Sequence, residues 1–212
     1  MTYELDHLFI LTDVNASSAD KLVDAGIIEG APNIHHGQGT TNRRFFFNNS
    51  MIECIWVHDE TEAKSEQTKQ THLFPRWQGR ASTSPFGICF HPTSDEQSPP
   101  FPSWDYVPQY MPDGITIQIA DTVNQLEEPF LFFSAQARSS DNKVKHPAGM
   151  ENITAVQVTH PYTNIDSPSI DAIQHLITFT TGDTHLLTVT FDDHRQGKTL
   201  NLQPDLPLII HY

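Results

Sequence analysis

The two ends of the chain share one order of elements: a strand, then a helix, then a run of strands. Apolar density with β-branched and aromatic residues indicates the strands, and apolar residues at helical spacing indicate the helix. In the N-terminal part, the expected elements are a strand at 3–12, a helix at 15–26 and strands at 27–30, 41–49 and 50–57. This order predicts a βαβββ unit, with a tight hairpin between its last two strands.

The C-terminal part repeats this order loosely. Its helix is expected at 166–177, with Asp166 or Ser167 as the N-cap and Pro168 in the first turn. The surrounding strand candidates are residues 152–160 before the helix and 178–181, 185–193, 198–203 and 206–212 after it. This half has one strand more than the N-terminal part, so the pairing of its strands stays open.

The middle of the chain is irregular, but its composition is not that of a linker. Its strand candidates are 84–92, 113–121 and 128–133. A mobile linker would contain more Gly and Ser and fewer large aromatic residues than the stretch 98–114 does. We therefore expect one domain. Its parts are an N-terminal module at 1–58, a middle segment at 59–150 and a C-terminal βαβββ-like module at 151–212.

The charge of the chain excludes some classes of partner. Acidic residues outnumber basic ones by 26 to 12, which gives a formal net charge of −14. Such a surface repels phosphate backbones and anionic membranes, so we expect neither nucleic acid nor a membrane as a partner. The N-terminus lacks the basic region and cleavage site of a signal peptide. These features predict a cytoplasmic protein, in which Cys54 and Cys89 are reduced core thiols.

Glu53 is a carboxylate inside the apolar strand "MIECIWV". Strand alternation places it on the same face as Met51 and Ile55, so the acid points toward an otherwise apolar side. Burying an unpaired carboxylate costs several kcal/mol, so Glu53 needs a metal ion, a cationic or hydrogen-bonding partner, or a wet cavity. An ion pair with Arg43 or Arg44 on the neighbouring strand is one alternative.

Several stretches together resemble the glyoxalase-like branch of the vicinal oxygen chelate (VOC) superfamily. They are "LDHLFILTD", "HHGQGTTNRRFFFNN" and "MIECIWV", with weaker similarity in "MPDGITIQIA", "EPFLFF", "HPAG" and "ITAVQVTHP". The resemblance implies an α+β fold in which paired βαβββ modules form a half-open mixed β-barrel, here with an irregular, strand-containing middle insertion. Such proteins include isomerases, dioxygenases, fosfomycin-modifying enzymes and non-catalytic proteins that sequester drugs, so the fold alone does not define the reaction.

The resemblance also implies a divalent metal ion, held by ligands from the first and last strands of each module. His7 and Glu53 occupy those positions in the N-terminal module. If the C-terminal unit is the partner module, His211 is the third ligand, and the set suits Zn, Ni, Mn or Fe. If instead residues 84–92 open the partner module, Gly87 stands at the ligand position and supplies none. His7 could equally be a core histidine.

The segment "HHGQGTTNRR" is the densest polar cluster in the chain. It could line the mouth of a cavity, with His35 or His36 as acid or base and Arg43 or Arg44 neutralising an anionic substrate. Adjacent residues of a strand face opposite ways, so one arginine at most enters the cavity; we assign the catalytic positions to His35 and Arg44. The alternative is a tight connector whose polar side chains bond their own backbone.

These observations support two hypotheses for the function. The first is a metal-dependent glyoxalase-like enzyme, of lyase, isomerase or dioxygenase type, that polarises vicinal oxygens of a small substrate. The second is a metal-free protein of the same fold that binds or sequesters a small molecule. Middle-segment aromatics that could wall the pocket are Phe74, Trp77, Phe86, Phe101, Trp104, Tyr106 and Tyr110. A homodimer is a further expectation.

Overall fold

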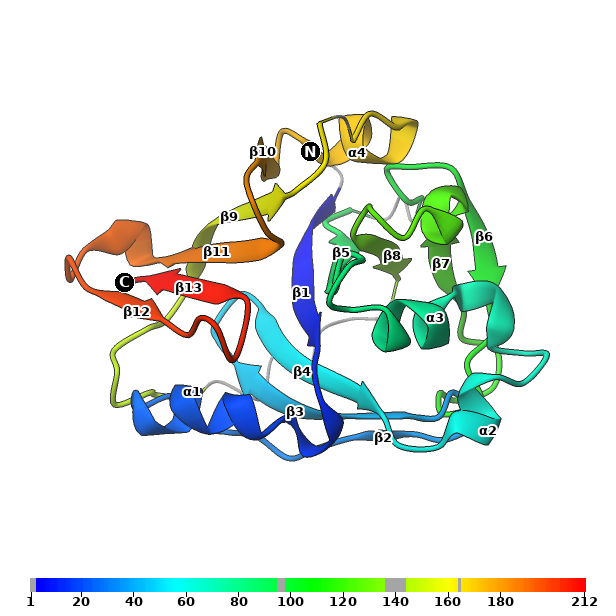
Figure 1. Cartoon of the computed structure of the whole chain (residues 1–212), viewed down its shortest axis with the longest axis horizontal. Helices are drawn as coiled ribbons and strands as arrows, with labels where there is room; N and C mark the ends of the chain where they lie inside the picture. The colour runs from blue at the N-terminus through cyan, green and yellow to red at the C-terminus, as the bar shows by residue number, and fades with distance from the viewer. Residues whose placement is uncertain (1–2, 95–97, 136–143, 164) are drawn as a thin grey trace.

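Two β-sheets make up most of the fold (Figure 1). The structure is a computed structural model and describes residues 3–94, 98–135, 144–163 and 165–212. An eight-stranded mixed sheet curls into a half-barrel, and a five-stranded sheet packs beside it. The helices are short. The predicted fold class, α+β with a half-open mixed barrel, is confirmed.

The first half of the large sheet comes from the N-terminal module. Its elements are β1 (Tyr3–Leu11), the 3₁₀ turn η1 (Val14–Ala19), α1 (Asp20–Asp24), β2 (Ile34–His35), β3 (Thr40–Phe46) and β4 (Met51–Val57). Strands β1 and β4 run parallel, and β3 and β4 form the predicted hairpin. The strand expected at 27–30 is not formed. Ile27 instead enters the core, and Gly30 bonds the Arg44 carbonyl, so the sheet edge is the short β2.

The second half of the same sheet comes from the middle segment. Its strands are β5 (Phe86–Pro92), β6 (Ser103–Tyr106), β7 (Ile117–Ala120) and β8 (Phe130–Ser134). The full strand order is β2-β3-β4-β1-β5-β8-β7-β6. The parallel pair β5–β8 repeats the parallel pair β1–β4, and antiparallel β1–β5 pairing joins the halves. The partner of the N-terminal module is therefore the middle segment, whose first strand is the one expected at 84–92, and not the C-terminal unit.

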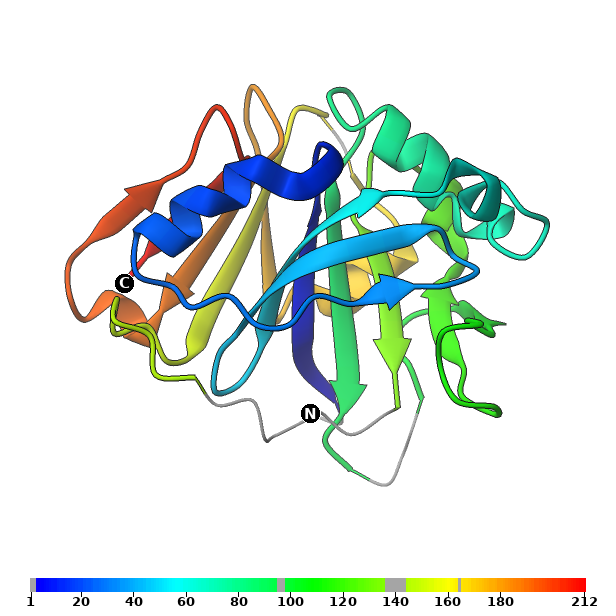
Figure 2. The same ribbon diagram turned by 90° about the horizontal axis from the view of Figure 1, so that it is seen from below.

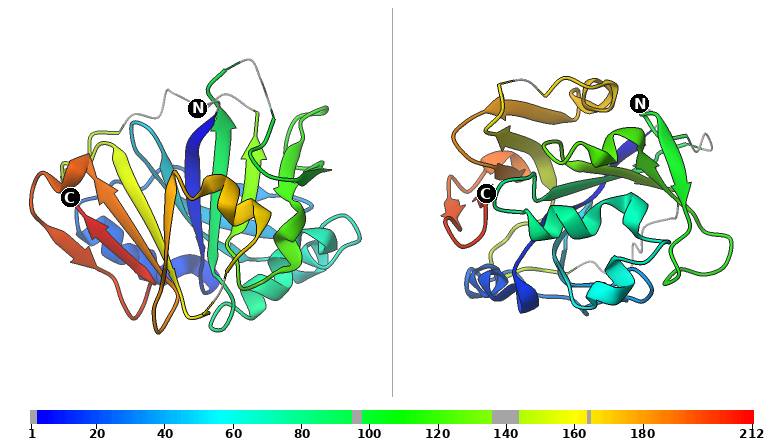
Figure 3. Two further views of the ribbon diagram at one scale, coloured as in Figure 1. Left: turned by 90° about the horizontal axis from the view of Figure 1, so that it is seen from above. Right: turned by 45° about the vertical axis from the view of Figure 1, so that its right-hand side comes forward.

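The C-terminal module forms the second sheet, in the order β10-β9-β11-β13-β12. Its elements are β9 (Ile153–His160), α4 (Pro168–Ile173), β10 (Ile177–Thr181), β11 (Leu186–Phe191), the turn η5 (Asp192–His194), β12 (Thr199–Asn201) and β13 (Leu208–His211). The predicted cap of the helix is confirmed at Ser167, whose hydroxyl accepts a hydrogen bond from the Ile170 amide. Figure 3 shows α4 at the side of the large sheet, where the Tyr3 hydroxyl bonds the Ala172 carbonyl at 2.8 Å.

The two faces of the large sheet have different neighbours. One face packs its Leu8, Ile88 and Phe133 against the second sheet in a continuous apolar core. α1 lies across the end of that second sheet (Figure 2), and its Lys21 forms an ion pair with Asp205. The opposite face, inside the curl, has a separate apolar cluster that includes Phe9, Cys89 and Phe132. Strand alternation thus separates a structural face from a face that is open to a pocket.

A buried arginine joins α3 to η3 and the segment that follows it. The short helices of the middle segment are α2 (Glu60–Ala63), η2 (Lys69–Thr71), α3 (Leu73–Gln78) and η3 (Asp121–Asn124). Arg76 of α3 is fully buried. Its guanidinium donates to five backbone carbonyls, those of Ser84, Val123, Leu126, Gln125 and Glu128, at 2.5 to 3.4 Å. Sequence analysis did not identify this residue.

Within the described ranges, no helix has the length and apolarity needed to cross a membrane.

Replacing Arg76 by Met should destabilise the protein by about 3 kcal/mol or more, because buried carbonyls that lose a charged donor keep their desolvation cost. Urea-induced unfolding followed by circular dichroism measures this. The matched control is Arg80→Met: Arg80 pairs with exposed Asp13 at the surface, and its loss should change stability by about 1 kcal/mol or less. Equal effects of the two substitutions would contradict a structural role for Arg76.

Candidate functional site

A pocket of about 330 Å³ lies inside the curl of the large sheet. Its walls come from β1, β3 and β4 on one side and from β6, β7 and β8 on the other, with Thr71 and Leu73 at its rim. The volume is that of a small-molecule site rather than a macromolecular interface. His7, Glu53, His35 and Arg44, four of the five site residues expected from the sequence, line this one pocket.

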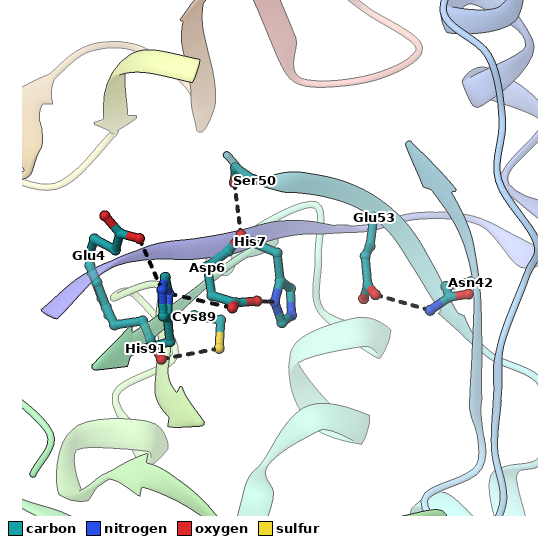
Figure 4. Close-up of polar contacts among 9 residues, drawn as sticks. Glu4, Asp6, His7, Asn42, Ser50, Glu53, Cys89 and His91 are labelled. Carbon is teal, nitrogen blue, oxygen red and sulfur yellow. Dashed lines mark hydrogen bonds and ion pairs between the residues drawn. The ribbon is translucent and has the colours of Figure 1, made fainter. Parts of the chain in front are cut away.

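A β-bulge positions His7 and its neighbour Asp6. The register between β1 and β5 shifts between Leu5 and His7, so Asp6 and His7 both line the pocket although they are adjacent in a strand. The Asp6 carboxylate Oδ1 lies 2.6 Å from Nδ1 of His7. In the view of Figure 4, the His7 ring lies between the Asp6 and Glu53 side chains. The bulge therefore creates a carboxylate–imidazole pair that the sequence pattern did not predict.

Glu53 is buried on β4, with only 7% of its surface exposed. Its Oε1 accepts a hydrogen bond from Nδ2 of Asn42 at 3.2 Å (Figure 4). Neither arginine of β3 forms an ion pair with it in the described part of the chain: Arg43 bonds Glu29 and Asp20 on the other face of the sheet. The structure therefore contradicts the alternative in which Glu53 forms an ion pair with Arg43 or Arg44. A neutral amide is the direct partner.

The pKa values of this pair follow from burial and proximity. Burial raises the pKa of Glu53 above its ordinary range, although the nearby charges of His7 and Arg44 oppose the shift. For His7, burial lowers the pKa, but Cys89, the hydrogen bond to Asp6 and the charge of Glu53 outweigh it and raise the pKa well above 6.5. The neighbours of His7 thus favour its protonated form.

The turn between β2 and β3 brings His35 to the pocket and leaves His36 exposed. Nδ1 of His35 lies 2.8 Å from Oγ1 of Thr40, and the same oxygen accepts from Nε2 of Gln38 at 2.8 Å. The Thr40 hydroxyl is buried, so both contacts are shielded from solvent. The His35 ring packs on Tyr110, with the two centroids 4.5 Å apart.

Two glycines explain the shape of this turn. Gly37 and Gly39 have φ of 78° and 75°, which favours glycine, and both amides donate to Oε2 of Glu62 in α2. The two alternatives for this segment, a tight connector and a lining of the cavity, therefore both apply. Its polar groups bond within the turn and to α2, and the turn also supplies His35 to the pocket wall.

Three donors on the pocket wall have unused hydrogen-bonding capacity. Arg44 uses Nε on the Ala31 carbonyl at 2.7 Å, and in the described ranges its two terminal nitrogens have no protein partner. The hydroxyls of Tyr106 and Tyr110 also have no hydrogen bond to the residues that the structure describes. Burial raises the pKa of Tyr106 to about 12 and that of Tyr110 further, so both phenols are neutral donors.

Apolar side chains from β1, β7 and β8 cover much of the pocket surface. They are Phe9, Ile117, Ile119, Phe130 and Phe132. Sequence analysis considered seven aromatic residues as possible pocket walls. Tyr106 and Tyr110 line the pocket, and the other five do not. The aromatic residues that sequence analysis did not assign to the pocket are those of β1 and β8. Alternation along "EPFLFF" was the available signal, since Phe130 and Phe132 share a face.

His211 is not near this pocket. It lies in β13 of the second sheet, where Nδ1 is 2.9 Å from the Thr199 hydroxyl. In the other half of the large sheet, the ring of Phe9 covers Gly87, and a methyl group there would lie 2.0 Å from Cε1 of Phe9. Phe130 and Phe132 take the inward positions of β8. The three-ligand set that the family resemblance implies is therefore not assembled, and we derive no reaction step through it.

Comparison with known proteins supports the fold but names no activity. No family model matches the chain, and no curated protein matches it. A solved structure of a hypothetical protein from Staphylococcus aureus is similar over 99% of this chain and 98% of its own, with a TM-score of 0.58 and 13% identity. A hypothetical protein, BH1468, from Bacillus halodurans C-125 covers 66% of this chain and 98% of its own, with a TM-score of 0.42 and 11% identity.

Acidification should destabilise the protein partly through His35. Burial and the charge of Arg44 lower the pKa of His35 from 6.5 to about 3, so the folded protein keeps it neutral while the unfolded chain protonates it. This stability is complete above pH 6.5 and is lost as the pH falls toward 3. Between pH 7.5 and 4.5, the wild type should lose about 2 kcal/mol more than His35→Gln in urea unfolding. The exposed-site control His36→Gln should behave as the wild type.

Proposed function

We propose that the protein binds a small organic molecule that carries an apolar ring and an acidic, oxygen-bearing group. The observation behind this proposal is the division of the pocket between two segments of the chain. The charged residues that line it, Arg44 among them, come from the N-terminal module, and the middle segment supplies the rings of Phe130 and Phe132 and the two tyrosines with unused hydroxyls. Such a division fixes the orientation of a ligand as well as its class.

The donors favour an anion over a neutral ligand. A guanidinium with two free terminal nitrogens matches a carboxylate in a bidentate geometry, and phenol hydroxyls can complete the contact. The positive charge of His7 adds to the attraction, whereas Asp6 is already engaged by that imidazole. Glu53 is kept compatible with an anion by its raised pKa and by its bond to Asn42.

A second candidate function is a metal-dependent glyoxalase-like reaction in the same pocket. It is favoured by one observation, namely that His7 and Glu53 project from adjacent strands into a common space. Stoichiometric divalent metal in untagged protein, lost in Glu53→Gln, would support it. The assembly as a homodimer and the cytoplasmic location stay predictions.

The proposed binding is tested with matched pairs of ligands in the presence of EDTA. Aromatic carboxylates of the benzoate and phenylacetate type should raise the melting temperature, and their neutral amides should not. Arg44→Met should weaken carboxylate binding tenfold or more, about 1.4 kcal/mol, and Arg44→Lys should weaken it less because the charge remains. Calorimetric titration measures both effects.

Controls separate the charged contact from the apolar contacts. Phe132→Ala should weaken every ring-bearing ligand, because it removes contact area and not charge. Arg80→Gln, outside the pocket, should leave affinity unchanged. Equal binding of acids and amides would refute the anionic class, and no thermal shift with either series would refute binding of ring-bearing acids altogether.

A further inference from the structure

One cluster of metal-ligating side chains lies beside the pocket but does not include Glu53. Asp6, His7 and Cys89 each offer one atom that could bind a metal ion, and these three atoms all lie within 4.8 Å of one another. Strand pairing brings them together: His7 of β1 is the register partner of Cys89 of β5, and the bulge turns Asp6 to the same side. The cluster spans the junction between the two halves of the large sheet.

We infer that Asp6, His7 and Cys89 form a binding site for a thiophilic divalent cation of the Zn(II) class. Imidazole, carboxylate and thiolate are the three donor types that Zn(II) accepts in tetrahedral sites. Asp6 and His7 line the pocket, so the fourth position would face its interior, open to water or to a bound oxygen ligand. This cation site goes beyond the proposed function, because binding of an aromatic acid does not require it.

The surroundings of the cluster suit a cation. His91 lies behind Asp6, with Nδ1 at 3.5 Å from Oδ2, and its Nε2 contacts Glu4 at 3.0 Å (Figure 4). Carboxylate–histidine contacts of this kind orient the ligands of metal sites. Cys89 is fully buried, and burial raises the pKa of its thiol to about 11. A coordinated cation would stabilise the thiolate and the neutral imidazole, and the thiol proton of Cys89 and a ring proton of His7 would both pass to solvent on binding.

This ligand set differs from the one that the family resemblance implies. Glu53 bonds Asn42 and is not part of the cluster, and His211 lies in the second sheet. A rival use of the same residues is nucleophilic catalysis, with Cys89 activated by His7. That use requires a substrate to reach the sulfur, but Cys89 has no exposed surface and does not line the pocket.

Cobalt(II) is the appropriate probe, since it substitutes for Zn(II) and its bond to a thiolate gives a charge-transfer band in the near ultraviolet. The full-length protein is freed of metal with a chelator, desalted and titrated with Co(II), with no organic ligand present. We expect one equivalent to bind with this band. Cys89→Ser should abolish the band and lower the affinity at least tenfold, and Asp6→Asn should lower the affinity with the band retained.

The matched control uses the other cysteine. Cys54 is equally buried but lies in the core on the opposite face of the sheet. The chain has two cysteines, so a band that persists in Cys54→Ser arises from Cys89, even if the Cys89 variant fails to fold. Glu53→Gln should keep the band. Absence of the band in the wild type, or metal binding that Glu53→Gln abolishes and Cys89→Ser does not, would overturn the inference. Because this titration and the EDTA-based ligand screen are independent, either can fail alone.

Discussion

The antiparallel pairing of β1 with β5 is the contact on which the rest of the molecule depends. It joins two half-sheets, each built around a parallel pair of its own, and it sets where the residues of one half lie against the other. The same pairing places His7, which lines the pocket, opposite the buried Cys89. A shift of one residue would turn His7 into the core and Leu8 into the pocket, so the register that builds the core also decides which side chains line the pocket.

Much of the fold was predictable because local patterns decide it. The hairpin β3–β4, the cap at Ser167 and the alternation that turns Glu53 inward all depend on residues close in sequence. Pairing between distant segments was not predictable in the same way. Both 84–92 and 151–212 could have been the partner of the first module, and neither propensity nor period distinguishes them, because that choice depends on long-range packing.

The site shows the same limit in more detail. His7, Glu53, His35 and Arg44 reach one pocket because alternation and the glycine turn are readable from sequence. The position of His211 could not be predicted, because it depends on which segment pairs with the N-terminal module. The Asp6–His7 contact was missed for another reason: a bulge breaks the alternation rule, and adjacent residues then face the same side.

The packing of Phe9 over Gly87 has a consequence for how a ligand approaches. The two halves of the large sheet repeat the same strand arrangement, so a pocket with matching residues in both would accept a molecule in either of two opposed orientations. Here, Phe9 fills the place opposite Gly87, and the charged residues that line the pocket, among them Asp6, His7, Arg44 and Glu53, all come from the N-terminal half of the sheet. The repeated backbone therefore encloses a space whose charge is confined to one half, and the two orientations are not equivalent.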